Sequence, residues 1–443
     1  MSLVRNSLLT LIGTVSRVVL SMAGQIIISR VLGPGGKGLY AFLVQIPTVL
    51  VPLSSLGLNY ANTYYIAKDK EDGPKAAGNA TVLALILGAL MSLGVGLSYL
   101  VLRQGYMQAV SLSQLQLMVL VIPFGLLNLY WLSIVWGLNR IAKYNIGLMI
   151  QFVVVAVGVA ALGAFHRLTV TNAFAIWVLG NVLTSLYFLP DMLKLSNWRI
   201  FVLDLSYVRK TLGFGLKSYA ANVMMIINYR LDVFIITGFL PLTQVGLYTT
   251  AVALAEMVGY VGNAVNTALI PKLASGEDAL TFESTPKVLR LTLFLTFLAA
   301  LALALTAYPL IWLFFGVRFL GSFYPLLLLL PGVIALGGAT VISGDLMARG
   351  KPVYNSIATG VSVVLTIILD FSLIPLWGIK GASIASSLVY IALFTLNFCF
   401  LKRESGYGLA QILILTREDA SEMFSYARTI FYQIMTSRGG TRS

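Results

Sequence analysis

The sequence predicts an all-α polytopic membrane protein, with about twelve transmembrane helices in two parallel six-helix halves around a central cavity. Three observations predict this. Of the 443 residues, 58% are hydrophobic and only 10% are charged, whereas soluble domains carry about 25% charged residues. Apolar runs of membrane-spanning length recur along the chain. The cations between these runs fall mainly in alternate loops, as expected when loops lie on opposite sides of a bilayer.

Twelve apolar runs are long enough to cross the hydrocarbon core, which takes roughly 17–25 helical residues. They are Ser7–Val31, Leu39–Ala67, Ala76–Leu102, Leu112–Asn139, Tyr144–Phe165, Leu168–Pro190, Leu212–Gly238, Leu242–Pro271, Leu291–Val317, Phe319–Ala348, Pro352–Trp377 and Gly381–Leu401. The first run follows a single Arg5 and lacks a small-residue cleavage site, so we expect a retained helix rather than a signal peptide.

The net charge of +14 follows the positive-inside rule and does not require a nucleic-acid partner. With the N-terminus placed in the cytoplasm, 22 Lys and Arg residues fall on the cytoplasmic side and five in the outer loops. We therefore expect both termini to be cytoplasmic. A basic segment with a weak apolar helical face, residues 403–443, is expected to lie on the cytoplasmic membrane surface as an amphipathic tail.

The chain repeats itself, which predicts two related halves. The tripeptide Gly-Leu-Tyr occurs at 38–40 and again at 246–248, and Tyr-Asn occurs at 144–145 and again at 354–355. The two offsets are nearly equal, and six spans per half keep both halves in one orientation, so the repeat is parallel. We expect an N-terminal half over residues 1–200 and a C-terminal half over residues 201–402.

Two spans carry polar side chains at helical spacing. In the second span these are Gln45, Thr48, Pro52, Ser55, Asn59 and Asn62, and in the eighth they are Thr249, Glu256, Tyr260, Asn263 and Thr267. Such side chains could hydrogen-bond between helices. Because the pattern runs for several turns in both halves, we favour the interpretation that these two stripes line a water-filled cavity.

Charged residues inside the spans are costly and mark functional sites by default. Arg17 lies about 15 Å into the first span, and Arg230 lies in the seventh. Arginine suits phosphate or carboxylate because its planar fork binds oxyanions through two hydrogen bonds. The acids Asp232, Glu256 and Asp370 could bind a coupling cation or proton, or one of the last two could form a structural pair with Arg230. Asp345 is expected to pair with Arg349, four residues further along its helix.

Three segments resemble the polysaccharide-transporter branch of the multidrug/oligosaccharidyl-lipid/polysaccharide exporter superfamily, which contains O-antigen and capsule-unit flippases. They are "RVLGPGGKGLYAF" (30–42), "YRLDVFIITGFLPLTQVGLYTTA" (229–251) and "IPLWGIKGASIASS" (374–387). "SRVVL" (16–20) also resembles the related lipid II flippases, which implies a cavity position for Arg17. The sequence departs from the pattern at Asp370, where the family often has Asn.

The resemblance implies a flippase that moves undecaprenyl-pyrophosphate-linked oligosaccharide from the inner to the outer leaflet by alternating access, without covalent chemistry. It implies the bacterial or archaeal cytoplasmic membrane, no cofactor or metal apart from a coupling Na⁺ or H⁺, and polymerases or glycosyltransferases as partners. The residues expected to bind substrate are Arg17, Arg230, Gln45, Thr48, Ser55, Asn59, Tyr260 and Asn263, and those expected to couple an ion are Asp232, Glu256 and Asp370. The alternatives are a drug or metabolite exporter, or a polyprenyl-dependent membrane glycosyltransferase or polymerase.

Overall fold

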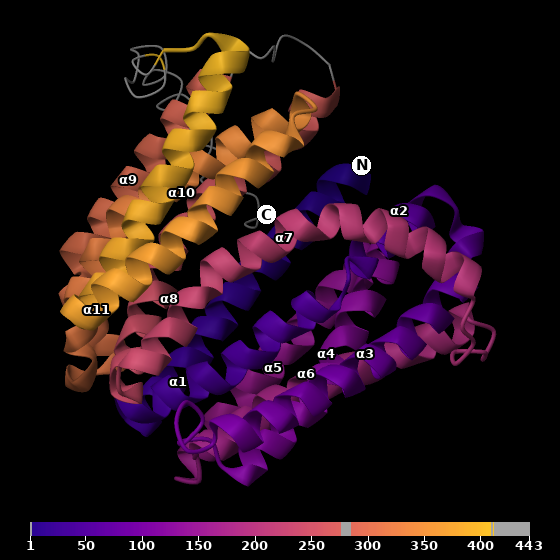
Figure 1. The fold of residues 1–443 in the computed structure, drawn as a ribbon, viewed down its shortest axis with the longest axis horizontal. Helices are drawn as coiled ribbons and strands as arrows, with labels where there is room; N and C mark the ends of the chain where they lie inside the picture. Colours follow the sequence, from indigo (N-terminus) through magenta and orange to yellow (C-terminus); the bar gives the residue numbers. More distant parts are fainter. Residues whose placement is uncertain (1, 276–284, 409–410, 412–443) are drawn as a thin grey trace, which may run out of the picture. The chain divides into compact units, whose positions relative to one another are not determined.

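The computed structural model describes residues 2–275, 285–408 and 411, and within this part of the chain every element is helical (Figure 1). Side chains of 2–12, 217–218, 220–222 and 261–275 are also outside the described part. The elements are α1 (Ser2–Ser54), α2 (Leu58–Lys68), η1 (Lys70–Asp72), α3 (Gly73–Leu102), α4 (Leu112–Gly137), α5 (Ile141–Ala164), α6 (Val170–Leu195), α7 (Leu205–Phe239), α8 (Leu242–Ser275), α9 (Thr285–Leu310), η3 (Ile311–Phe315), η4 (Val317–Ser322), α10 (Phe323–Ala348) and α11 (Pro352–Ser405).

Eight helical segments in the described residues are long and apolar enough to cross a membrane. Two of them, in α1 and α11, each contain two of the predicted apolar runs, so the eight segments account for ten runs. The remaining two runs correspond to α7 and α8. The predicted all-α membrane fold with about twelve spans is therefore confirmed.

Glycine breaks the two longest helices at the junctions between predicted runs. Gly33 has φ +68° and ψ −179° inside α1, and Gly378 has φ +60° and ψ −139° inside α11. Such positive φ angles are strained for residues with a Cβ but open to glycine. The long helices are therefore each two helical arms joined at a glycine, and each junction falls between two of the predicted runs.

The described chain forms two compact units. One contains residues 1–251, 308–325 and 366–382, and the other contains 252–307, 326–365 and 383–443. These units are defined by contacts, whereas the predicted halves, 1–200 and 201–402, are defined by the internal repeat. The halves therefore stay a prediction, and so does the amphipathic tail, most of which lies outside the described residues.

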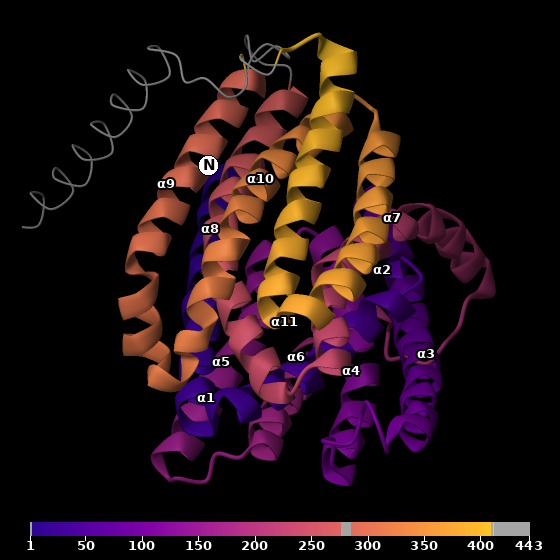
Figure 2. The same ribbon diagram turned by 60° about the vertical axis from the view of Figure 1, so that its left-hand side comes forward.

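The first unit is built on packed antiparallel helices, of which α3, α4, α5 and α6 run side by side in Figure 1. Its core has two apolar clusters, one around Phe42, Ile122 and Phe174 and the other around Ile66, Tyr130 and Phe188. In the second unit, α9 and α10 run alongside one another (Figure 2), and Leu289 of α9 packs with Ile342 of α10.

Two glycines of the repeated Gly-Leu-Tyr sequence meet in the first unit. A Cβ on Gly38 would lie 1.8 Å from the Leu242 carbonyl oxygen, and a Cβ on Gly246 would lie 1.9 Å from the Pro34 carbonyl oxygen. Gly246 follows Gly38 by 208 residues, and Leu242 follows Pro34 by the same 208. The contact between α1 and α8 is therefore reciprocal under the repeat offset, and it requires glycine on both sides.

Candidate substrate and ion sites

Arg17 lies on the first arm of α1, and its side chain folds back onto its own helix. Its Nε donates to the Gly13 carbonyl over 3.3 Å, and its Nη2 donates to the Thr14 hydroxyl over 2.9 Å. The residue is half-buried, and among the described residues no carboxylate lies within ion-pair distance of it. Because only neutral oxygens contact this guanidinium, its positive charge is not neutralised by the protein and is available to bind an external oxyanion.

Arg230 is also half-buried, in α7, and engages other groups of the protein. Asp370 is not one of them, because among the described residues its carboxylate has neither a hydrogen-bond partner nor an ion pair. The structural pair between Arg230 and Asp370, which the sequence left open, is therefore not formed. A substrate role for Arg230 stays a prediction.

Asp232 of α7 and Asp370 of α11, which we call the acid pair, lie close together in the first unit. The Thr366 hydroxyl donates to Asn228 Oδ1 over 2.8 Å and joins the two helices. Asp232 follows Asn228 by four residues, and Asp370 follows Thr366 by four residues, which is about one helical turn in each case. The side chains are buried, with 0% exposure for Asp370 and 7% for Asp232, and their charges interact.

The two members of the acid pair differ in their partners. The Tyr248 hydroxyl donates to Asp232 Oδ2 over 2.5 Å, and the Val233 amide donates to Oδ1 over 2.7 Å. Both oxygens of Asp370 are buried and have no hydrogen-bond partner among the described residues. Two neighbouring carboxylates in an apolar interior resist being charged together. The acid pair can therefore hold a shared proton or a single monovalent cation.

Glu256, the third acid predicted to couple an ion, is placed differently. It belongs to the second unit, where it is exposed on α8 and interacts with other groups. Tyr260, one turn further along α8, is 44% exposed. The side chain of Asn263 lies outside the described residues. The substrate role predicted for Tyr260 and Asn263 is therefore still a prediction.

The polar stripe predicted along the second span is not continuous, and in this respect the prediction is wrong. The helix stops at Ser54 and restarts at Leu58, because Leu56 and Gly57 have φ of +50° and +73°. At this break a Cβ on Gly57 would lie 2.2 Å from the Gly215 carbonyl oxygen of α7, so the backbones touch. Polar residues before and after this break therefore do not share one helical face, as they would on an unbroken helix.

The four predicted substrate residues of this stripe consequently have different environments. Gln45 is buried and its amide nitrogen has no partner, whereas Thr48 is exposed and donates to the Val44 carbonyl. Ser55 is buried at the break, and its hydroxyl donates to the Pro52 carbonyl. Only Asn59, which is half-buried, lines a described pocket.

That pocket, which we call the aromatic pocket, was not predicted from the sequence. It has a volume of about 920 Å³ and lies in the first unit among α2, α4, α5 and α7. Its rings come from Tyr60, Tyr64, Trp136, Tyr144 and Phe214. Aromatic residues scattered over four helices have no common period, so the sequence carried no signal that would gather them.

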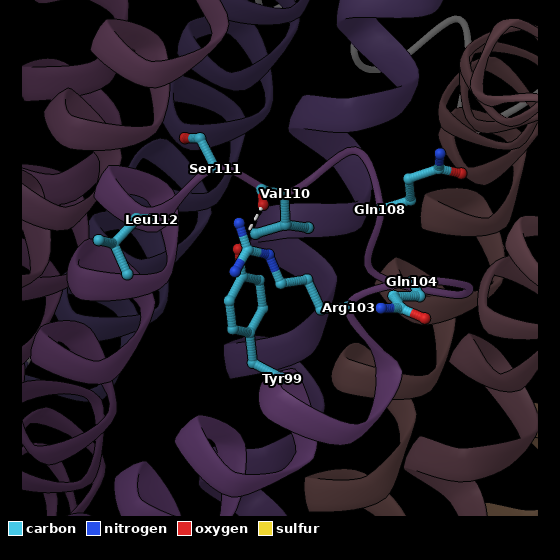
Figure 3. Close-up of a pocket in the computed structure, with 7 residues that line it drawn as sticks. All are labelled: Tyr99, Arg103, Gln104, Gln108, Val110, Ser111 and Leu112. Atoms are coloured by element: carbon cyan, nitrogen blue, oxygen red, sulfur yellow. Dashed lines mark hydrogen bonds between the residues drawn. The ribbon is translucent and has the colours of Figure 1, made fainter.

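A smaller pocket of about 420 Å³ lies at the α3–α4 connection, on the side predicted to be outside. Figure 3 shows Arg103 lying against Tyr99, with its guanidinium 6.0 Å from the ring centroid. The Tyr99 hydroxyl donates to the Val110 carbonyl over 3.0 Å and closes the connection. Arg103 is the only cation among the described residues that line this pocket, and it lies against a ring of its own unit, so we assign the pocket no role.

The fold that these sites belong to is that of multi-pass membrane transporters. The chain is similar to the lipid II flippase MurJ in an inward closed conformation, with a TM-score of 0.75 and 16% identity over 89% of this chain and 87% of that one. It is also similar to an inward-facing multidrug resistance MATE family transporter, with a TM-score of 0.68 and 15% identity over 88% of this chain and 94% of that one.

Sequence comparison assigns the family. Residues 27–323 match the family described as polysaccharide biosynthesis protein, and the chain belongs to this family. A relative in Shigella flexneri, named "Putative O-antigen transporter", is 22% identical over 88% of this chain and 95% of that protein. A relative in Haloferax volcanii, named "Probable low-salt glycan biosynthesis flippase Agl15", is 28% identical over 36% of this chain and 35% of that protein.

Proposed function

We propose that this protein is a flippase for undecaprenyl-pyrophosphate-linked oligosaccharide units, which it moves from the inner to the outer leaflet by alternating access. The observation that carries the proposal is Arg17, a half-buried arginine held by two neutral oxygens of its own helix. Family membership and the names of the relatives support a lipid-linked glycan as the substrate. The relatives are transporters rather than enzymes, so covalent chemistry is not part of the proposal.

The physical reason for this substrate is charge. A pyrophosphate has to leave water to cross the membrane, and a guanidinium inside a span can replace part of its hydration. A cationic drug would instead be repelled by an arginine that lacks an acidic partner. The drug-exporter alternative therefore receives no support from Arg17, although the fold is shared with such exporters.

The proposal is tested by replacing Arg17 with Ala and with Lys and scoring surface display of the polymer in cells. We expect both variants to lose display, because lysine cannot reproduce the two-hydrogen-bond geometry of the guanidinium. Protein level in the same membranes serves as the control for insertion. Normal display in Arg17→Ala cells that contain normal amounts of protein would contradict the proposal.

Arg230 requires a rescue design, because a structural pair with Glu256 is an alternative to a phosphate role. Breaking a structural pair is harmful mainly through the charge left unpaired, so removing the acid as well should restore function. We expect Arg230→Ala and Arg230→Ala with Glu256→Ala to be equally inactive in polymer display. Recovery in the double variant would assign Arg230 to structure and remove it from the substrate site.

We also propose that transport is coupled to Na⁺ or H⁺ through the acid pair. The support is that Asp370 is fully buried with both oxygens unpartnered, beside the charge of Asp232. A proton or Na⁺ bound there would reduce the net charge of the two carboxylates from −2 to −1. The experiment measures uptake of the lipid-linked oligosaccharide into vesicles under an imposed Na⁺ gradient and under an imposed proton gradient, which would show which ion is used. No response of uptake to either gradient would contradict the proposal.

For location we propose the cytoplasmic membrane with both termini on the cytoplasmic side, because of the cation asymmetry between loops. In a Cys399→Ala background, cysteine substitutions at Lys70, Lys210 and Thr285 should be protected from an impermeant thiol reagent. Substitutions at Gly35, Gln104 and Gly316 should label in intact cells. Labelling of the first set from outside would reverse the orientation. Glycosyltransferases that build the unit and a polymerase that consumes it are the partners this function requires.

A further inference from the structure

The aromatic pocket has two pairs of rings whose planes are set by contact with one another. Tyr64 of α2 stacks on Phe214 of α7, with centroids 4.6 Å apart and planes 14° apart. Trp136 of α4 lies against Tyr144 of α5, with centroids 4.7 Å apart and planes 54° apart. Such pairs fix ring orientation. Two walls of the pocket are therefore formed by paired aromatic rings.

These rings are also accessible. Tyr64 is 47% exposed, Trp136 is 43% exposed and Tyr60 is 37% exposed. Rings that line a cavity and keep their faces open are typical of ligand pockets, where aromatic groups bind apolar surface and a few polar groups set orientation.

The polar groups of the aromatic pocket come from the same helices. Asn59 has a buried Oδ1 that has no hydrogen-bond partner among the described residues. The Thr63 hydroxyl donates to the Ser133 carbonyl over 3.1 Å, which ties α2 to α4 at the pocket. Lys68 is its only cation, and none of the described residues that line it is acidic. The pocket therefore offers ring faces and neutral hydrogen-bonding groups, with no attraction for a cation.

Arg17 lies next to this pocket. Tyr144, a wall residue, is close enough to Arg17 for the two side chains to interact electrostatically. Helices α1 and α5 pack closely here, because a Cβ on Gly13 of α1 would lie 3.3 Å from Asn145 Oδ1 of α5. The Arg17 side chain donates a hydrogen bond to the carbonyl of the same Gly13. A phosphate held by Arg17 would therefore have its substituent within reach of the aromatic pocket.

We propose that the aromatic pocket binds a pyranose ring of the lipid-linked oligosaccharide, at the end of the glycan attached to the pyrophosphate. A pyranose has an apolar C–H face that fits an aromatic ring and hydroxyl edges that fit amide and hydroxyl groups. A polyprenyl chain would use only the apolar part of this lining. The pocket volume of about 920 Å³ falls in the range that holds a drug-sized ligand. This inference rests on the proposed flippase function and adds a glycan subsite to it.

The test measures binding to the full-length protein in lipid nanodiscs by calorimetry. The probes are farnesyl pyrophosphate and farnesyl pyrophosphate carrying one glucose, galactose or N-acetylglucosamine. We expect at least one sugar-bearing probe to bind more tightly than the sugar-free one. Tyr64→Leu and Trp136→Leu should each weaken that probe about tenfold and leave farnesyl pyrophosphate unchanged. Tyr64→Phe, which keeps the ring, is the matched control and should bind as the parent does.

Each other outcome is informative. Equal affinity for all four probes, or aromatic variants that weaken the sugar-free probe equally, would overturn the subsite. If Leu132→Ala and Leu148→Ala weaken every probe while Tyr64→Leu changes none, the pocket holds the lipid chain and the inference is wrong. Arg17→Ala should weaken all probes, so its failure to do so would count against the proposed function and not against the subsite. Thermal unfolding of each variant confirms that it folds.

Discussion

Two buried acids in different units of this protein lie in opposite kinds of surroundings. Asp345, in α10, is 1% exposed and is compensated, since it forms an ion pair with Arg349 over 2.5 Å and accepts a 2.7 Å hydrogen bond from the Thr285 hydroxyl. Asp370, in α11, is equally buried but has no hydrogen-bond partner and lies beside another acid. Burial is therefore common to both, and the surrounding charge is what separates a structural acid from a candidate functional one.

The Asp345–Arg349 pair and the acid pair also differ in whether the sequence alone could predict them. The Asp345–Arg349 pair follows from a spacing of four residues on one helix, as predicted from the sequence. The acid pair joins residues more than a hundred positions apart, and only packing of α7 on α11 brings them together. A local pair stabilises its own helix, whereas a pair between helices can respond when those helices move.

The largest effect is expected from Asp345→Asn. Removing one partner of a buried ion pair leaves the other charge uncompensated, which costs about 3–5 kcal/mol. Because Arg349 is 13% exposed and can partly reach water, we expect the lower end of that range. Chemical unfolding of the purified protein measures the change. Asp345→Leu with Arg349→Leu should recover most of the loss, and no recovery would show that the pair is not what stabilises this region.

Asp370→Asn should behave in the opposite way. It replaces a buried carboxylate that lacks a partner with a neutral group, so the free energy of unfolding should stay the same or rise by about 1 kcal/mol. Polymer display should nevertheless be lost, because the acid pair can no longer take up a cation. A large loss of stability in this variant would make Asp370 structural and would abolish the contrast with Asp345.

An intermediate effect is expected from Tyr248→Phe. This variant removes the hydroxyl that donates to Asp232 Oδ2, and losing a hydrogen bond to a charged group costs about 1.5–3 kcal/mol. If the acid pair couples an ion, the same change should alter the ion concentration that gives half-maximal uptake into vesicles. A loss of stability without any change in ion dependence would place Tyr248 and Asp232 outside the coupling site.

The smallest effect is expected at a third acid, Asp204, which lies outside the spans at the start of α7. Its carboxylate accepts hydrogen bonds from the Ser206 hydroxyl over 2.6 Å and the Tyr207 amide over 3.0 Å. The Ser206 hydroxyl, followed by the Tyr207 amide, lowers the pKa of Asp204 below its usual 3.8. Since the folded pKa is lowered, the stabilisation is present above the unfolded pKa and is lost as the pH falls through the folded one.

The corresponding experiment compares the thermal unfolding midpoint of the parent and Asp204→Asn at about pH 5 and about pH 3, on either side of the usual aspartate pKa. The two midpoints should differ at the higher pH and converge at the lower one. A difference that persists unchanged at low pH would mean that the charge of Asp204 does not contribute. In that case the charge of Asp204 would not stabilise the fold at all, whereas the charge of Asp345 would.

Span positions and local pairs could be predicted because they depend on apolar runs and on residues a few positions apart. The break at Leu56 and Gly57 was not predicted, because it lies where Gly57 closely approaches Gly215 of α7, a residue more than 150 positions away in the sequence. That break invalidates the single polar face assumed for the second span. The aromatic pocket was missed for the same reason, since its rings are gathered by the packing of four helices and by no sequence period.

The contact between Gly38 and Gly246 has the form of an isologous interface in a two-fold dimer, in which residue i meets residue j and j meets i. Here both partners lie in one polypeptide, as in a gene that has been duplicated and fused. A Cβ at either position would lie within 1.9 Å of a backbone carbonyl oxygen of the other helix, so a single substitution is enough to block the contact. Each glycine can therefore be replaced alone to test its own side of the interface.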